Sequence, residues 1–401
     1  MGLGRGFRRL WAGNAAGNLS DGIVFVAIPL LATSLTSDAL LIAGLAAVYS
    51  AVRLLVVVPV GVYVDRLDRR TILWVTNAAR AVLLLTLAVL FATGNGSLTL
   101  LYVVFAGIGV LETAADNAAL SILPSIVPGR QLDRANGRVS AAQLVADEFV
   151  GPPLGGLLFA AAAALPVFAA GGFYAAAGIF FLALSRRAGG GAGRPLLPRR
   201  SVYREALDGA VWLRGHRLLG WLAVVGGLAS VAYMMPFSVL VLYSQQTLGL
   251  DSAGYGAILA VSALGGLVGS LGTAALRARL GYGGTIAASL ALGAVSMFAL
   301  AVVESVWLAA VLLAVYILHA VVWGICVSSL RQRLVPDALR GRVNASSKVL
   351  GLVGLTVGAV LGGLLAASAG LSAPFLASGA LFVVCAVIVR AVFRRRTVRR
   401  V

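Results

Sequence analysis

Residues 39–93 read ALLIAGLAAVYSAVRLLVVVPVGVYVDRLDRRTILWVTNAARAVLLLTLAVLFAT, two apolar runs joined by one short charged loop. Each run, at 39–62 and 72–93, is long enough to cross the roughly 30 Å hydrocarbon core of a membrane as a helix. The same alternation continues along all 401 residues, of which 60% are hydrophobic and only 11% charged. The mean hydropathy of +0.98 excludes a water-soluble globular protein. We therefore predict an all-α, polytopic membrane protein.

Twelve apolar runs between helix breakers are predicted to span the membrane. They lie at 10–33, 39–62, 72–93, 98–121, 139–162, 165–185, 219–244, 253–276, 284–303, 306–330, 343–369 and 372–391. Thirty of the 32 Lys and Arg residues lie before the first run, after the last run or in alternate connections, if Lys348 and Arg390, just inside the ends of their runs, are counted with these. The other connections contain none. By the positive-inside rule, both termini are predicted to lie on the cytoplasmic side of the cell membrane.

A polar stretch at 186–218, rich in Gly, Pro and Arg, divides the chain into an N-terminal six-helix half at 1–185 and a C-terminal half at 219–401 with a basic tail. This stretch is predicted to be a cytoplasmic loop. Three short patterns recur in the second half at an offset of 207 or 208 residues. They are Ile126-Val127-Pro128 with Leu334-Val335-Pro336, Asn136 with Asn344, and Gly155-Gly156-Leu157-Leu158 with Gly362-Gly363-Leu364-Leu365. Such a register indicates two parallel repeats.

Four motifs resemble the major facilitator superfamily, and the resemblance covers the whole chain. The loop Gly61-Val62-Tyr63-Val64-Asp65-Arg66-Leu67-Asp68-Arg69-Arg70 is similar to the signature Gly-x-x-x-Asp-Arg-x-Gly-Arg-Arg, with Asp68 where Gly is common. Gly151-Pro152-Pro153-Leu154-Gly155-Gly156 resembles the end of a motif of proton-coupled exporters, whose upstream glycines are replaced by Arg138 and Asp147. Two further segments, 123–136 and 18–22, resemble the macrolide-efflux and enterobactin-exporter branch of drug:proton antiporters.

The resemblance implies two parallel six-helix halves with alternating access and a monomeric carrier that exports small amphipathic compounds by proton antiport. A cationic or neutral, drug-like cargo is favoured because the N-terminal half holds an excess of buried acids. Two alternatives stay open. The chain could be a dedicated exporter of a metabolite such as a siderophore, or a non-transporting receptor or lipid-handling protein with the same fold.

Seven ionisable residues are predicted to lie roughly 12–18 Å deep in the membrane, where charges are costly and functional by default. They are Asp21, Arg53, Arg80, Glu112, Asp116, Asp147 and Glu148. Similar depths predict structural ion pairs of Arg80 with Asp116 and of Arg53 with Glu112.

This pairing leaves Asp21, Asp147 and Glu148 without a cationic partner, and all five acids are candidates for proton coupling or for the cavity. Asp21 is favoured as the proton carrier because the resemblance places the first span along the cavity, where Asn18 is a substrate contact candidate. Asp147 and Glu148 point about 100° apart on a helix, so at most one is expected to face the cavity squarely. Direct binding of a cationic substrate by these acids is the competing interpretation.

The C-terminal half offers His319 as its one titratable residue near mid-membrane, either a proton carrier or a hydrogen-bonding partner between helices. Aromatic residues at Tyr233, Phe237, Tyr316 and Trp323 could wall a substrate pocket or could simply pack against neighbours.

The residue patterns that ATP hydrolysis, metal binding and nucleophilic catalysis require are absent from the sequence. The sequence has no phosphate-binding glycine loop ending in Lys, no cluster with metal-ligand spacing and no Ser/His/Asp arrangement. We therefore expect no enzyme activity, cofactor or metal. The basic C-terminal tail is predicted to contact anionic lipid and not nucleic acid. The expected partners are the small-molecule substrate, protons and membrane lipid.

The charged loop yields the first testable prediction. Gly61, Asp65, Arg66, Arg69 and Arg70 either anchor the cytoplasmic face or act as a conformational latch between the halves, as the resemblance implies. If they form a latch, Asp65→Asn lowers transport while expression and membrane insertion stay near the wild-type level. A normal transport rate in the Asp65→Asn variant contradicts the latch.

Overall fold

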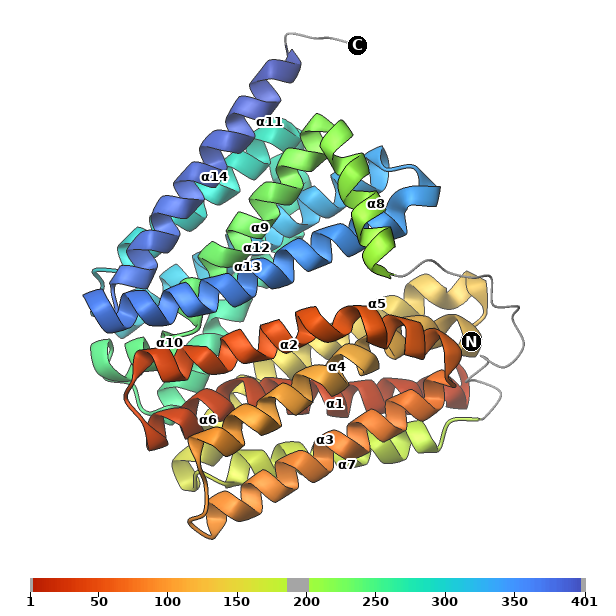
Figure 1. Ribbon diagram of the computed structural model, residues 1–401, viewed down its shortest axis with the longest axis vertical. Coiled ribbons are helices and arrows are strands. Elements are labelled where there is room, and N and C mark those ends of the chain that lie inside the picture. The colour runs from red at the N-terminus through yellow and green to blue at the C-terminus, as the bar shows by residue number, and fades with distance from the viewer. Residues whose placement is uncertain (1–2, 186–201, 398–401) are drawn as a thin grey trace. The chain divides into compact units, whose positions relative to one another are not determined.

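The computed structural model describes residues 3–185 and 202–397, except for the side chains of a few residues in these ranges, among them 61–66. Within these ranges every regular element is a helix (Figure 1). The predicted all-α membrane fold is therefore confirmed.

The helices of the N-terminal part run from the first described residues to the start of the central stretch. Their bounds are α1 (Gly4–Leu35), α2 (Ala39–Arg66), α3 (Arg69–Ala92), α4 (Leu98–Ile126), the 3-10 turn η1 (Gly129–Gln131), α5 (Leu132–Gln143), the π-helix η2 (Leu144–Val150), α6 (Gly151–Ala161) and α7 (Leu165–Leu182).

The C-terminal part follows the same pattern. Its elements are α8 (Val202–Gly215), α9 (Arg217–Phe237), α10 (Leu240–Leu242), the π-helix η4 (Tyr243–Thr247), α11 (Ser252–Leu300), α12 (Val306–Leu334), the 3-10 turn η5 (Asp337–Leu339), α13 (Arg340–Ala369) and α14 (Ala373–Thr397).

Eleven helical segments in the described residues are long and apolar enough to cross a membrane, and one of them carries two spans. The helix α11 has 49 residues, so it would be about 74 Å long if straight, more than twice the hydrocarbon thickness. Its backbone breaks at Gly281, where φ is 66° and ψ is 177°, values open to glycine and strained for other residues. The break falls in the predicted connection between the eighth and ninth runs, which agrees with twelve spans.

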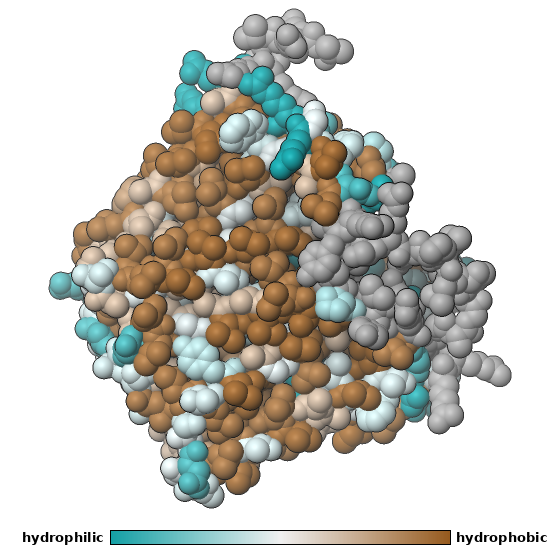
Figure 2. Space-filling model, viewed as in Figure 1, coloured by the Kyte–Doolittle hydropathy of each residue, from teal (hydrophilic) through white to brown (hydrophobic). Residues whose placement is uncertain are grey.

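Many large apolar side chains lie exposed on the surface of the helices. Trp307 is 83% exposed, Val302 79% and Leu271 75%. Apolar side chains, brown in Figure 2, cover most of the visible surface. Contiguous exposure on this scale is expected where lipid replaces water as the solvent.

The chain forms two compact units that are not continuous in sequence. The first consists of Met1–Leu35, Val52–Arg199 and Asp251–Ala260, and the second of Thr36–Ala51, Arg200–Leu250 and Val261–Val401. Within the first unit α1 contacts α4, α5, η2, α6 and α7. Within the second unit α9 contacts α8, α13 and α14. Each unit thus holds most of one predicted half and a short segment of the other.

The repeated glycine pairs explain this exchange of segments. Gly155 lies against the backbone of Ile23 in α1, and its partner in the repeat, Gly362, lies against the backbone of Met235 in α9. The next glycines contact the exchanged segments: Gly156 touches the start of α11, and Gly363 touches the start of α2. A Cβ at any of the four would overlap these neighbours. The four glycines therefore allow equivalent close helix contacts in both repeats.

The central stretch differs from the predicted loop. Residues 202–215 form the helix α8, which packs along α13, where Asp208 pairs with Arg342 at 3.6 Å. Gly209 allows this approach because a Cβ there would overlap the Arg342 carbonyl. The sequence analysis missed α8 because the segment is too short and too polar to be read as a span. The remaining predicted loop residues, up to 201, lie outside the described residues.

Close helix packing in the second unit yields a stability prediction. A Cβ at Gly265 would overlap the backbone carbonyl of Ala314 in α12, whereas Gly272 on the same helix faces open space. Gly265→Val should therefore lower the free energy of unfolding by about 1–3 kcal/mol, the usual cost of overpacking. Gly272→Val is the matched control, with the same change in side chain and helix propensity. Thermal unfolding of both variants in detergent tests this, and equal losses would contradict the packing argument.

Candidate functional site

The membrane-embedded acids gather in the first unit on α1, α4 and η2. Asp147 lies close enough to Asp21, Glu112, Asp116 and Glu148 for their negative charges to repel its own. The sequence predicted the shared depth of these acids, and the fold brings them into one cluster, which we call the acidic cluster. The two arginines within these spans, the partly exposed Arg53 and the buried Arg80, each occupy a different part of it.

Arg80 on α3 is the more deeply buried arginine, with 5% of its side chain exposed. Its Nη1 lies 3.4 Å from Oδ1 of Asp21, and its Nη2 donates to Oδ1 of Asn77 at 3.2 Å. The fully buried Tyr174 of α7 donates its hydroxyl hydrogen to the same Asp21 oxygen. The Arg80 guanidinium also lies 4.4 Å from the centre of the Tyr174 ring. This set of contacts compensates the cost of burying both charges.

Arg53 on α2 bridges two acids of α4. Its Nη1 lies 3.0 Å from Oε1 of Glu112, and its Nη2 lies 3.1 Å from Oδ2 of Asp116. The two acids are four residues apart and so share one helix face, where one guanidinium can neutralise both. Arg53 and Glu112 are about one-fifth exposed, and Asp116 is about half exposed.

One predicted pairing and one related expectation need correction. The predicted pair of Arg53 with Glu112 is present, but the predicted pair of Arg80 with Asp116 is wrong, since Arg80 contacts Asp21 and Arg53 contacts Asp116. The expectation that Asp21 lacks a cationic partner is therefore wrong as well. Depth alone could not separate the choices, because the rotation of each helix decides which side chains meet.

The sequence analysis also overlooked two residues that hold Arg80. Asn77 precedes Arg80 by three residues and therefore shares its helix face, a signal that was available. Tyr174 lies in an apolar run on α7, and only the packing of α7 against α1 and α3 brings its hydroxyl to Asp21.

Asp147 and Glu148 lie in the π-helix η2, which interrupts the predicted fifth span. The cause is local: Pro152 and Pro153 lack amide hydrogens, so the carbonyls four residues before them lose their helical partners. Single π-helical turns of this kind concentrate at functional sites. Gly22 lies directly against the Asp147 carbonyl, and Gly151 lies against Gly22, so α1 and η2 approach at backbone distance beside Asp21.

The two acids of η2 differ in their surroundings. Asp147 is partly buried, and within the described residues its carboxylate makes no hydrogen bond or ion pair. Glu148 is exposed. Asp147 is therefore the acid of the cluster that combines partial burial with a free carboxylate.

The exporter-type motif on α6 serves helix packing. Gly151, Pro152, Gly155 and Gly156 are all buried. The Pro152 carbonyl lies where a Cβ of Gly256 in α11 would be, and Gly155 faces Ile23 of α1. The motif thus packs α6 against α1 and the start of α11, both within the first unit.

The charged loop is resolved in part. Gly61 and the side chains of Asp65 and Arg66 lie outside the part of the chain whose side-chain environment the structure describes. Arg69 donates to the Ser121 carbonyl in α4 at 2.8 Å, and Arg70 donates to the Leu182 carbonyl at the end of α7. Asp68, which replaces the common glycine, caps α3 by accepting from the Arg70 amide at 3.2 Å.

The predicted aromatic residues of the second unit lie together. The ring centres of Tyr233 and Phe237 are 4.4 Å apart, and that of Tyr316 is 5.6 Å from Phe237. With Trp323, Tyr233 and Tyr316 also line a cavity of about 160 Å³. The Tyr316 hydroxyl is buried and has no hydrogen-bond partner in the described part of the chain. An unpaired buried hydroxyl beside a cavity is available to a bound molecule.

His319 is 2% exposed and packs edge-on against Phe382, with ring centres 5.0 Å apart. Its Nδ1 hydrogen-bonds the Tyr316 carbonyl within the same helix. Of the two interpretations left open, these contacts fit a packed hydrogen-bonding residue, although the bond lies within α12 and not between helices. Asn18, the substrate contact candidate of the N-terminal half, lies on α1 in the first unit, one turn before Asp21.

A larger cavity of about 370 Å³ opens beside the aromatic group. Its polar lining includes Arg331, Asn344, Ser347 and Lys348, and Trp323 also borders it. The Nε of Arg331 is buried without a hydrogen-bond partner among the described residues. The second unit therefore offers an aromatic wall next to a cationic, polar cavity.

Comparisons with known proteins agree with this architecture. The family model of the Major Facilitator Superfamily matches residues 10–345. The multidrug efflux pump Tap of Mycolicibacterium fortuitum is 30% identical over 386 residues, which cover 92% of this chain and 90% of Tap.

Solved transporter structures share the fold. A mutant of the nucleoside transporter NupG has a TM-score of 0.78 at 13% identity, covering 96% of this chain and 99% of NupG. A bacterial homologue of the human lysosomal transporter Spinster has a TM-score of 0.75 at 13% identity, covering 97% of this chain and 96% of its own. At these identities the likeness shows the fold alone.

The ion pair of Arg80 yields a stability prediction. Arg80→Gln leaves the Asp21 carboxylate without its cation and should lower the free energy of unfolding by about 3–5 kcal/mol. The double variant Arg80→Gln/Asp21→Asn should lose less than the sum of the two single variants, because neither charge is then left alone. Unfolding of the three variants in detergent gives the coupling energy, and strictly additive losses would mean that the pair is not formed.

Proposed function

The chain belongs to the major facilitator superfamily of transporters, and on that premise we propose that it exports small amphipathic compounds by proton antiport. It is a multi-pass protein of the cell membrane and a transporter, not an enzyme. The proposed cargo is cationic or neutral and drug-like, and the proposed unit of function is a monomer with both termini in the cytoplasm.

The observation that carries the proton proposal is the free carboxylate of Asp147 within the acidic cluster. Burial of an unpaired carboxylate favours its neutral form, so such a group can take up and release a proton as its surroundings change. The acids of α1 and α4 have cations beside them: Asp21 contacts Arg80, and Glu112 and Asp116 contact Arg53. We therefore assign the proton to Asp147 in preference to Asp21.

Asp21 has a second role in this proposal. Gly22, the residue after it, touches the Asp147 carbonyl, so a shift of α1 against η2 changes the environment of both acids at once. Protonation of Asp147 weakens the repulsion within the acidic cluster and favours the conformation in which the acids lie closest. Coupling of proton binding to substrate transport needs only one structural element with two conformations. The proton must favour one of these conformations and the substrate the other.

The substrate proposal rests on the aromatic group of the second unit. The aromatic group of Tyr233, Phe237 and Tyr316 supplies stacking surfaces, and the unpaired Tyr316 hydroxyl supplies one hydrogen bond. Independently of where the cargo binds, the excess of acids in the first unit favours a positively charged compound by long-range attraction. Multidrug efflux by the relative Tap fits the same class of cargo.

One observation favours a second candidate function. The 370 Å³ cavity beside the aromatic group is lined by Arg331 and Lys348 and by three neutral polar residues, Ser230, Asn344 and Ser347. This chemistry suits an anionic or oxygen-rich compound. Export of a dedicated metabolite such as a siderophore is the corresponding proposal, and an anionic dye included in the transport assay separates it from drug export.

The proton proposal is tested with purified protein in liposomes that carry an imposed pH gradient and a fluorescent lipophilic cation. Asp147→Asn should abolish accumulation driven by the gradient, because the variant cannot exchange a proton, while substrate counterflow without a gradient continues. Glu148→Gln, next in sequence and exposed, is the matched control and should accumulate the cation as the wild type does.

Two results would contradict the proposal. Accumulation against the gradient by the Asp147→Asn variant would remove Asp147 from the proton role. Absence of flux for a panel of cations, with wild-type protein shown to be folded, would remove the drug-like cargo and leave the dedicated metabolite.

A further inference from the structure

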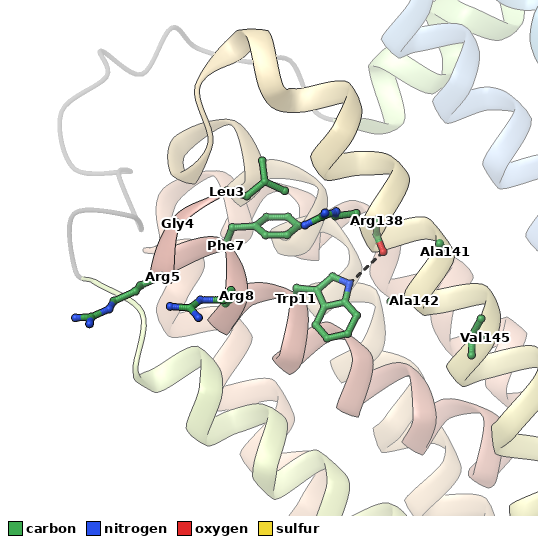
Figure 3. A pocket seen from close by; sticks show the side chains of 10 residues that line it. All are labelled: Leu3, Gly4, Arg5, Phe7, Arg8, Trp11, Arg138, Ala141, Ala142 and Val145. Atoms are coloured by element: carbon green, nitrogen blue, oxygen red, sulfur yellow. Dashed lines mark hydrogen bonds between the residues drawn. The ribbon is translucent and has the colours of Figure 1, made fainter. Parts of the chain in front are cut away.

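A groove of about 830 Å³ lies apart from the acidic cluster, between the start of α1 and the helix α5 with η2 (Figure 3). It is lined by Arg5, Arg8 and Trp11 of α1, by Arg138 of α5 and by Val145 of η2, among others. The proposed export mechanism uses none of these residues. All of them belong to the first unit.

Arginines of α1 and α5 line one end of the groove, and the side chains of Arg5 and Arg8 point away from Arg138 (Figure 3). The groove contains three arginines and no acid among its lining residues. Arg5, Arg8 and Arg138 are exposed, and no ion pair links them to an acid within the described ranges. The first amides of α1 lie at the same end, where the helix dipole adds positive potential. Guanidinium groups in this setting bind phosphate oxygens well, because their paired N–H groups match them.

The rest of the groove is apolar. Trp11 is 40% exposed. Its ring is held in place by a hydrogen bond from Nε1 to the Arg138 carbonyl at 3.1 Å, the dashed line in Figure 3. Val145, 53% exposed, lies seven residues beyond Arg138, about 10 Å deeper along the helix. Ala141 lies between them. The wall therefore runs from arginines at the membrane boundary into the hydrocarbon region.

An arginine-lined end joined to an apolar wall matches one class of molecule. We propose that this groove binds an anionic phospholipid, with its headgroup at the end lined by Arg8 and Arg138 and an acyl chain along Trp11, Ala141 and Val145. Tryptophan and arginine at the membrane boundary are the usual partners of lipid headgroups. Such a lipid bridges α1 to α5 and η2, the element that carries Asp147, and stabilises the protein on binding.

The test is lipid binding to the purified, delipidated protein in detergent, measured by native mass spectrometry. Dioleoylphosphatidylglycerol should bind at one site about tenfold or more tightly than dioleoylphosphatidylcholine, because the second lipid has no net charge. Arg8→Gln/Arg138→Gln should weaken phosphatidylglycerol binding by a similar factor. The matched control is Arg130→Gln/Arg134→Gln, which removes the same charge from exposed arginines that do not line the groove, and it should bind like the wild type.

Two further measurements locate the site. Ala141→Trp fills the groove at an exposed position without changing the charge, and it should also weaken phosphatidylglycerol binding. Brominated phosphatidylglycerol should quench part of the tryptophan fluorescence, and Trp11→Phe should lack that part.

Any of three results overturns the proposal. Equal affinity for the two lipids would mean that the arginines do not select the headgroup. Equal losses in the groove and control variants would mean that net charge alone attracts the lipid. Displacement of the lipid by inorganic phosphate at equal concentration would mean that the groove binds a soluble anion and not a lipid.

Discussion

The absence of water in the hydrocarbon core is the constraint on which the rest of this structure depends. A backbone in lipid must satisfy its own hydrogen bonds, so the spanning segments are helical, and no charge can stay unpaired without cost. The two buried arginines show the consequence. Arg80 is held by Asp21, Asn77 and Tyr174 from three different helices, and Arg53 bridges two acids of α4. These contacts fix the rotation of α1, α3, α4 and α7 within the first unit.

Lipid gives the helices no hydrophobic reason to associate, so contact between them depends on close packing. The glycines of the repeat allow this packing. Gly155 of α6 lets the backbone of α1 approach closely, and Gly362 of α13 does the same for α9. Gly156 and Gly363 likewise contact the starts of α11 and α2. Because the contacts are between backbones, they leave the helix faces free to slide. A transporter that must change conformation benefits from interfaces of this kind, in which packing is tight but few side chains interlock.

The π-helical turn at 144–150 connects packing to chemistry. Two prolines of the exporter-type motif remove the amide hydrogens that would continue a regular helix, and the resulting bulge carries Asp147 beside Gly22. The motif therefore shapes the fifth span and positions an acid at the same time. The groove proposed to bind lipid begins at the other end of this segment, where Arg138 of α5 lines it together with the start of α1. The proposed proton site and the proposed lipid site thus share η2.

The sequence by itself determined the membrane class, the twelve spans and the repeat, because lipid imposes hydrophobicity and charge placement residue by residue. It also predicted that Tyr233, Phe237, Tyr316 and Trp323 could share a pocket wall, and they lie together. Only the tertiary structure decided that Arg80 meets Asp21 and not Asp116, that Tyr174 joins them, and that α8 packs along α13. Depth follows from position along a helix, but partners follow from how each helix is rotated about its axis, and that rotation is set by contacts between residues far apart in sequence.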